Sequence, residues 1–411
     1  VTELLKRTAV DGDSGLNELK QMRETCWQWF SYSAVAIVPQ KKLREDLIFS
    51  EFDLFPEFRL LSILTMLELT KLIGDDVPIS SGDPRSFSLL QKLLQCSSHP
   101  DRVDFRKHMG GANLKGVQFE DIDLSGADFS NSRLDSAKFA RCNLDSAVLK
   151  GAALSGGSFD SCRMRGMVAK GADLTGCTVR YCDMSEAVLR EAQVEASSFV
   201  NVSFKGSDLS GVRMSKSSVV SSSLVSANMT GGKFAHSNFQ SVDFVQTKVT
   251  GAEFANCVFG FCLFDESELL IADFRGSQLS RVLLLNCIGD GLSAAKCEFT
   301  SFTCANCSFR EADLSGAKMV EANLRKCILA DSLLSSADLS DAFVRDCDLS
   351  RATLTMALLQ RANLSGTVGL DTVKTAEGAD LSGVTGLDLK IRAHLRKSGA
   401  RDEGASGFRY A

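Results

Sequence analysis

Large apolar residues recur at every fifth position over most of this 411-residue chain. Stepping by five from Leu114 to Leu364 gives 51 positions, of which 47 hold Leu, Phe, Met or Val. A second register, two residues earlier, holds mostly Ala, Cys, Ser, Gly, Thr or Val from Ala112 to Ala362. A helix repeats every 3.6 residues and a flat strand every two, so neither produces a strict period of five. The pattern predicts short repeated units that share one continuous core.

The five-residue pattern weakens in one short stretch. Three positions for large residues hold Gly289, Ala294 and Cys304 there, while two small positions hold Leu292 and Phe302. We interpret this stretch as a bulge or a loop that interrupts one repeat.

Four segments show the repeat most clearly, and they are Ala127-Asp128-Phe129-Ser130, Ala172-Asp173-Leu174-Thr175-Gly176, Ala312-Asp313-Leu314-Ser315-Gly316 and Ala362-Asn363-Leu364-Ser365-Gly366. They resemble the A(D/N)LXX units of pentapeptide-repeat proteins, and the resemblance spans about residues 112–366. It implies a mainly β fold, a right-handed quadrilateral β-helix of about 13 coils with four units in each coil. The large and small positions would face inward and the other three positions would face solvent. At about 4.8 Å per coil, the resulting rod would be roughly 60 Å long.

Composition divides the chain into three parts. All five prolines and both tryptophans lie within the first 100 residues. Residues 1–105 are therefore predicted to form a helical N-terminal domain, with one helix that begins at Pro56 and ends near Gly74. Residues 106–368 would form the β-helix, and residues 369–411 a C-terminal cap and tail. Within the cap, the sequence predicts a short helix over 387–397.

Cysteine supplies the most conspicuous candidate chemistry, because the chain has 14 cysteines and eleven of them occupy the small inward register. Cys304 and Cys307 form a CxxC pair, with Cys287 and Cys297 as further candidate ligands of a metal or redox site. We interpret these thiols as small apolar core residues that can replace alanine. No metal and no cofactor is predicted.

Other signatures of catalysis are absent from the sequence. It has no phosphate-binding loop, no nucleophile elbow and no zinc-protease motif, and its four histidines are scattered. We therefore predict no catalytic residues and no enzyme activity. A net charge of −5 argues against a nucleic-acid partner. No apolar run approaches the length of a membrane span, so we predict a soluble chain. Peripheral association with a membrane complex is compatible with this prediction.

One group of outward positions is unusually apolar, and it consists of Phe261, Leu263, Leu270, Ile271, Leu283 and Leu285. Exposed apolar patches mark interaction sites, so we predict a protein-docking surface there. The sequence thus favours a non-catalytic scaffold, a rigid β-helical rod that docks protein partners within a larger assembly. The alternative is a DNA-mimicking pentapeptide-repeat protein that binds a topoisomerase or another DNA-binding protein.

The first residue is Val1 and not methionine. If a leader has been removed, we expect the interior of an organelle, a plastid more than a mitochondrion. Otherwise we expect a cytoplasmic protein.

Overall fold

The computed structural model describes residue 106, residues 109–111 and residues 114–402. The helical domain predicted over 1–105 lies outside the described residues, as does the tail after residue 402. The chain divides into two compact units, and the division falls after Val168.

The first unit contains three short parallel strands, β1 (Gln118–Glu120), β2 (Lys138–Ala140) and β3 (Ser158–Asp160). Each pairs with the next at a separation of 20 residues, so one coil contains four pentapeptides. The middle residue of each strand points inward, and the rings of Phe139 and Phe159 stack with their centroids 4.7 Å apart.

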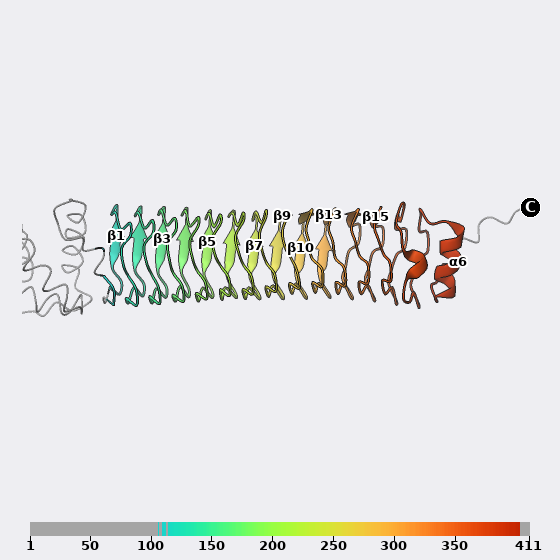
Figure 1. The fold of residues 1–411 in the computed structure, drawn as a ribbon, viewed down its shortest axis with the longest axis horizontal. Coiled ribbons are helices and arrows are strands. Elements are labelled where there is room, and N and C mark those ends of the chain that lie inside the picture. The colour runs from blue at the N-terminus through green and yellow to red at the C-terminus, as the bar shows by residue number, and fades with distance from the viewer. Residues whose placement is uncertain (1–105, 107–108, 112–113, 403–411) are drawn as a thin grey trace, which may run out of the picture. The chain divides into compact units, whose positions relative to one another are not determined.

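The second unit has the same kind of coil, with two strand-bearing faces. The first face carries β4 (Thr178–Arg180), β5 (Ser198–Val200), β6 (Ser218–Val220), β7 (Asn238–Gln240), β8 (Val258–Gly260), β10 (Gln278–Ser280) and β12 (Glu298–Thr300). The second face carries β9 (Leu263–Asp265), β11 (Leu283–Leu285), β13 (Thr303–Ala305), β14 (Asn323–Arg325) and β15 (Phe343–Arg345). Figure 1 shows these short arrows in parallel, with β5, β7 and β10 on the first face.

The third and fourth faces of the second unit pair through single bridges, such as Asp208 with Asn228 and Arg213 with Lys233. These bridges also join residues 20 apart, so the predicted four-unit coil is confirmed on every face. The fold is a mainly β, parallel β-solenoid of about 11 turns.

Asp and Asn recur at the outward position that precedes each large residue, and local hydrogen bonds explain why. Asp208 accepts a hydrogen bond from the backbone N–H of Ser210 at 3.0 Å, and Asp313 does the same for Ser315. Asn228 accepts from the N–H of Thr230 in the same way. Short side chains with an acceptor oxygen satisfy the turn backbone, which explains why Asp and Asn recur there.

The predicted bulge is wrong. Ile288 pairs with Ser308 and Ser293 pairs with Asp313, so the 20-residue register continues through the irregular stretch. A Cβ added to Gly289 would lie 2.5 Å from Cδ2 of Leu292, which shows that Leu292 fills the space that the missing side chain leaves. Large and small residues have therefore exchanged places within the core, and the backbone has not changed its path.

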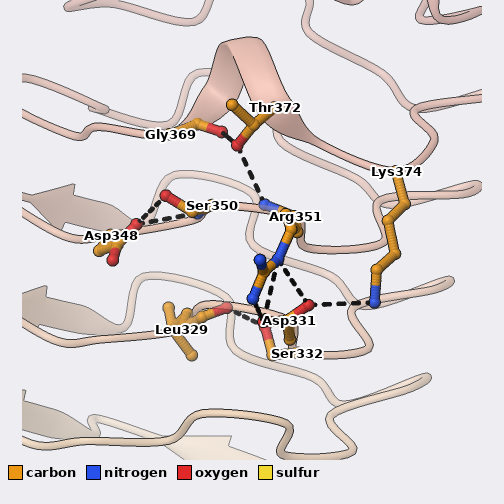
Figure 2. A network of polar contacts seen from close by, with 9 residues as sticks. All are labelled: Leu329, Asp331, Ser332, Asp348, Ser350, Arg351, Gly369, Thr372 and Lys374. Carbon is orange, nitrogen blue, oxygen red and sulfur yellow. Dashed lines mark hydrogen bonds and ion pairs between the residues drawn. The ribbon is translucent and has the colours of Figure 1, made fainter.

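The coil lengthens near its C-terminal end. Thr353 bridges to Thr375, 22 residues later, because a 3₁₀ turn η2 (Leu370–Thr372) adds two residues to that coil. Figure 2 shows how polar groups fasten this turn: the N–H of Arg351 donates to Oγ1 of Thr372 at 3.2 Å. The Arg351 side chain binds Asp331, which also forms an ion pair with Lys374 at 3.3 Å.

The solenoid extends beyond the predicted boundary at 368, since Asp380 bridges to both Leu358 and Arg401. After it comes helix α6 (Leu389–Lys397), close to the predicted range of 387–397. Asp388 caps the helix N-terminus by accepting from the N–H of Ile391 at 2.7 Å.

Candidate docking surface

The structure places four of the six predicted patch residues together on or beside the second face. Leu263 begins β9 and Leu283 begins β11, and the two are direct register partners on adjacent coils. Both are half-buried, as is Leu285. Phe261, in the turn before β9, is 58% exposed. We call Phe261, Leu263, Leu283 and Leu285 the second-face cluster.

Leu270 and Ile271 lie apart from that cluster, on the third face. Ile271 is 65% exposed and has a φ of 49°. The preceding and following coils carry Gly251 and Gly291 at this corner, where glycine has no steric penalty. A β-branched residue in this conformation costs about 1–2 kcal/mol. The predicted six-residue patch is thus two apolar patches on two faces.

Two further side chains border these patches, and the sequence pattern did not point to them. Arg281 lies over the Phe261 ring, with its guanidinium carbon 4.9 Å from the ring centroid. Ile288 is exposed on the third face, one coil after Glu268. The 20-residue spacing between Phe261 and Arg281 is the signal that could have found the cation–π contact.

The cysteines behave as core residues. All eleven in the small register are buried, and so is Cys304. Burial raises the pKa of the Cys257, Cys262 and Cys297 thiols to about 12. Such thiols stay protonated at neutral pH and are poor nucleophiles.

Of the two predicted partners of the CxxC pair, Cys287 contacts Cys307 and Cys297 does not join the pair. Cys304 Sγ lies 3.4 Å from Cys327 Sγ, whereas the Cys297 thiol donates to the Phe274 carbonyl at 2.8 Å. The sulfur of Cys307 accepts from the backbone N–H of Cys287 at 3.3 Å. Within residues 114–402, no group of three potential ligands has the arrangement a metal ion needs.

Several ion pairs join side chains on adjacent coils. Lys318 pairs with Glu298 at 2.6 Å, and Arg361 pairs with Asp341 at 2.5 Å, in each case across 20 residues. The Arg361 guanidinium holds the pKa of Asp341 below its usual value. Opposite charges thus stack on adjacent coils and screen one another.

In the part of the chain that the structure describes, no helix has the length and apolar character needed to cross a membrane. The longest helix there is α6, with nine residues and a basic last turn.

Comparison with solved structures finds several matches of low sequence identity. HetL from Nostoc sp. strain PCC 7120, involved in heterocyst differentiation regulation, is 21% identical over 68% of this chain and 93% of its own, with a TM-score of 0.19. Full-length QnrB1, a plasmid-mediated fluoroquinolone resistance protein, is 19% identical over 49% of this chain and 98% of its own, with a TM-score of 0.23. A pentapeptide repeat protein from the Arabidopsis thaliana thylakoid lumen is 23% identical over 34% of this chain and 82% of its own, with a TM-score of 0.15.

A search of curated protein sequences finds no match. Family models are more informative. The model described as "Pentapeptide repeat region" matches residues 112–189 and 197–274. The model described as "Pentapeptide repeats (8 copies)" matches residues 292–329 and 327–366. These matches cover more than half of the sequence and coincide with the coils described above, so the chain belongs to the pentapeptide repeat family.

Proposed function

We propose that this protein is a non-catalytic scaffold that docks a protein partner within a larger assembly. Pentapeptide repeat proteins are generally non-catalytic. The inward positions are filled by packed side chains, and the outward positions form flat faces on short parallel strands. Such faces present side chains at fixed spacing, which suits them to the recognition of another surface.

The second-face cluster is the observation that carries the proposal. Its leucines occupy outward positions that elsewhere hold polar residues, such as Asp243 one coil before Leu263. Burying the three leucines and Phe261 against a partner would remove apolar surface from water, at about 25 cal/mol per Å². An apolar centre with a polar surround is the usual anatomy of a protein interface.

Charge favours the scaffold over the DNA-mimic alternative. A DNA mimic requires a continuous row of negative charge, because the duplex carries one charge per about 1.7 Å of its axis. Here carboxylates such as Glu298 and Asp341 pair with cations on the next coil. We expect no inhibition of a DNA topoisomerase by the purified protein, and inhibition at equimolar protein would favour the alternative.

The docking proposal is tested by the double substitution Leu263→Asp and Leu283→Asp. Endogenous complexes would be purified through the tagged full-length chain and analysed by native mass spectrometry. We expect the double variant to lose the partner that the wild type retains, because two carboxylates would be buried without a cation.

Leu333→Asp is the matched control, since Leu333 is an exposed leucine at the same repeat position on the fourth face. It should keep the partner, and circular dichroism should show unchanged β content in both variants. Retention of the partner by the double variant would refute this docking surface.

A further inference from the structure

The first face of the second unit carries a surface without charge over four consecutive coils. From β5 to β8, its nine outward residues before Val258 are Ser198, Val200, Asn201, Ser218, Val220, Ser221, Asn238, Gln240 and Ser241. We call these nine residues the neutral platform. Over the same coils, each of the other three faces carries charged side chains, among them Asp243, Lys248 and Lys233.

Exposed aromatic rings stand at both ends of the neutral platform. Tyr181, one coil before Asn201, is 62% exposed, and Phe261, one coil after Ser241, is 58% exposed. The two rings occupy the same repeat position and are four coils apart, since β4 pairs in series with β5, β6, β7 and β8. At about 4.8 Å per coil, their separation along the column is about 19 Å.

Between the rings, hydrogen-bonding groups are available to a ligand. The exposed side chains of Asn201, Ser221 and Ser241 make no hydrogen bond to any described residue. Gln240 donates to Asn238 at 2.8 Å, which leaves its own carbonyl oxygen as an acceptor. The corresponding positions near the C-terminal end form ion pairs instead, as in Asp341 with Arg361.

We propose that the neutral platform, with Tyr181 and Phe261, binds a linear, uncharged glycan laid along the coils. Sugar rings have apolar C–H faces that stack on aromatic rings, and hydroxyl groups that exchange hydrogen bonds with hydroxyls and amides. A chain of pyranose rings repeats at a length close to one coil, so successive sugars would meet equivalent side chains. The nine platform residues carry no charge, whereas Arg180 precedes Tyr181 and Arg281 lies over the Phe261 ring, so cations stand only at the two ends. A polyanion gains most from Lys and Arg along its whole length, so a neutral ligand fits this face better.

The experiment is affinity electrophoresis of the full-length protein in native gels that contain one polysaccharide each. The neutral probes are hydroxyethylcellulose, a mixed-linkage β-glucan and galactomannan, and alginate is the anionic probe. We expect at least one neutral polymer to retard the wild type and alginate not to do so. Tyr181→Ala and Phe261→Ala should each weaken the retardation about fivefold, in line with the loss of one stacking contact.

Phe343→Ala is the matched control, because Phe343 is also exposed but lies on the second face. Its ring has an arginine over it as Phe261 has, with the guanidinium carbon of Arg345 4.9 Å from the ring centroid. This variant should retain wild-type retardation, as should the Leu263→Asp, Leu283→Asp variant that tests the docking proposal. Ser221→Lys, which introduces a charge at the centre of the platform, should abolish retardation without loss of β content.

Three results would overturn the proposal. The first is that no neutral polymer retards the wild type. The second is that Phe343→Ala weakens retardation as much as Tyr181→Ala does. The third is that alginate retards the protein and Tyr181→Ala leaves this retardation unchanged. A fourth result would also refute the glycan site, and light scattering would detect it. If the wild type is a dimer that Tyr181→Ala and Phe261→Ala dissociate, this face binds a second copy of the chain.

Discussion

At the scale of single residues, the side-chain volume inside a coil is conserved even where large and small residues exchange their usual positions. Ala294 stands at a large position, and the preceding small position holds Leu292. Cys304 and Phe302 are exchanged in the same way, and the Phe302 ring packs 4.6 Å from that of Phe299. The exchange is incomplete, because an apolar cavity of about 40 Å³ remains among these side chains, with Ala294 in its wall.

Filling this cavity should stabilise the protein. Ala294→Val adds two methyl groups beside the cavity, and each buried carbon contributes about 0.8 kcal/mol when it finds space. We expect the free energy of unfolding to rise by about 0.5–1.5 kcal/mol in urea titrations followed by circular dichroism. A fall in stability would show that the cavity cannot accept the valine without strain.

Gly289→Ala should have the opposite effect, although it too adds apolar volume to the core. The new Cβ would meet Leu292 at 2.5 Å and Phe309 at 2.9 Å, which is too close for any unstrained contact. We expect a loss of about 1–3 kcal/mol. Leu292→Ala in the same chain should recover part of this loss, so a double-mutant cycle should give a favourable coupling between the two sites. Additive effects would contradict the exchange of volumes described here.

At the scale of elements, the C-terminal end depends on one carboxylate. The side chain of Asp402 is only 1% exposed and binds Arg392 at 3.0 Å and Arg396 at 2.8 Å. These two arginines come from α6, so Asp402 fastens the helix to the chain that follows it. The neighbouring backbone completes the last coil, where the N–H of Leu381 donates to the Arg401 carbonyl at 2.8 Å.

Asp402→Ala should therefore loosen the cap locally. Removal of the carboxylate leaves Arg392 partly buried without its partner, at an expected cost of about 2 kcal/mol, less than for a fully buried pair. Hydrogen exchange at the Leu381 amide should accelerate accordingly. Asp388→Ala removes only the helix N-cap and should cost about 1 kcal/mol. Unchanged exchange at Leu381 in Asp402→Ala would show that the cap does not rely on this ion pair.

The sequence predicted the coil because its period decides which side chains face inward. From Leu114 to Leu364 that information is local and repeated, so the inward positions could be inferred without any long-range contact. The number of four units per coil came from the resemblance to pentapeptide-repeat proteins. The added residues at Leu370–Thr372 could not, because their accommodation depends on hydrogen bonds from Arg351, about 20 residues earlier. For the same reason the predicted patch proved to be two: Ile271 and Leu263 are close in sequence but lie on different faces.

At the scale of the whole molecule, carboxylates at the turn position recur from coil to coil in both units, as in Asp128 and Asp208. In the second unit, hydrogen bonds and the charge of Arg275 hold the pKa of Asp273 below its usual value. Hydrogen bonds from Ser382 and Gln360 lower the pKa of Asp380. Both shifts act in the same direction, toward the charged form of the carboxylate.

Stability should therefore be constant from pH 7 to about pH 5 and fall below about pH 4. The pKa of such an Asp is lower in the folded chain than its unfolded value of about 3.9, so the unfolded chain binds more protons as acid is added. The stabilisation is complete above the unfolded pKa and is lost as the pH falls through the folded one. Asp273→Asn is the decisive variant, because Asn143 and Asn363 show that an amide makes the same turn contact. It should lower stability at pH 7 and flatten the acid dependence measured by urea unfolding between pH 7 and pH 3. If the variant and the wild type lose stability in parallel, the acid response must come from other groups than the turn carboxylates.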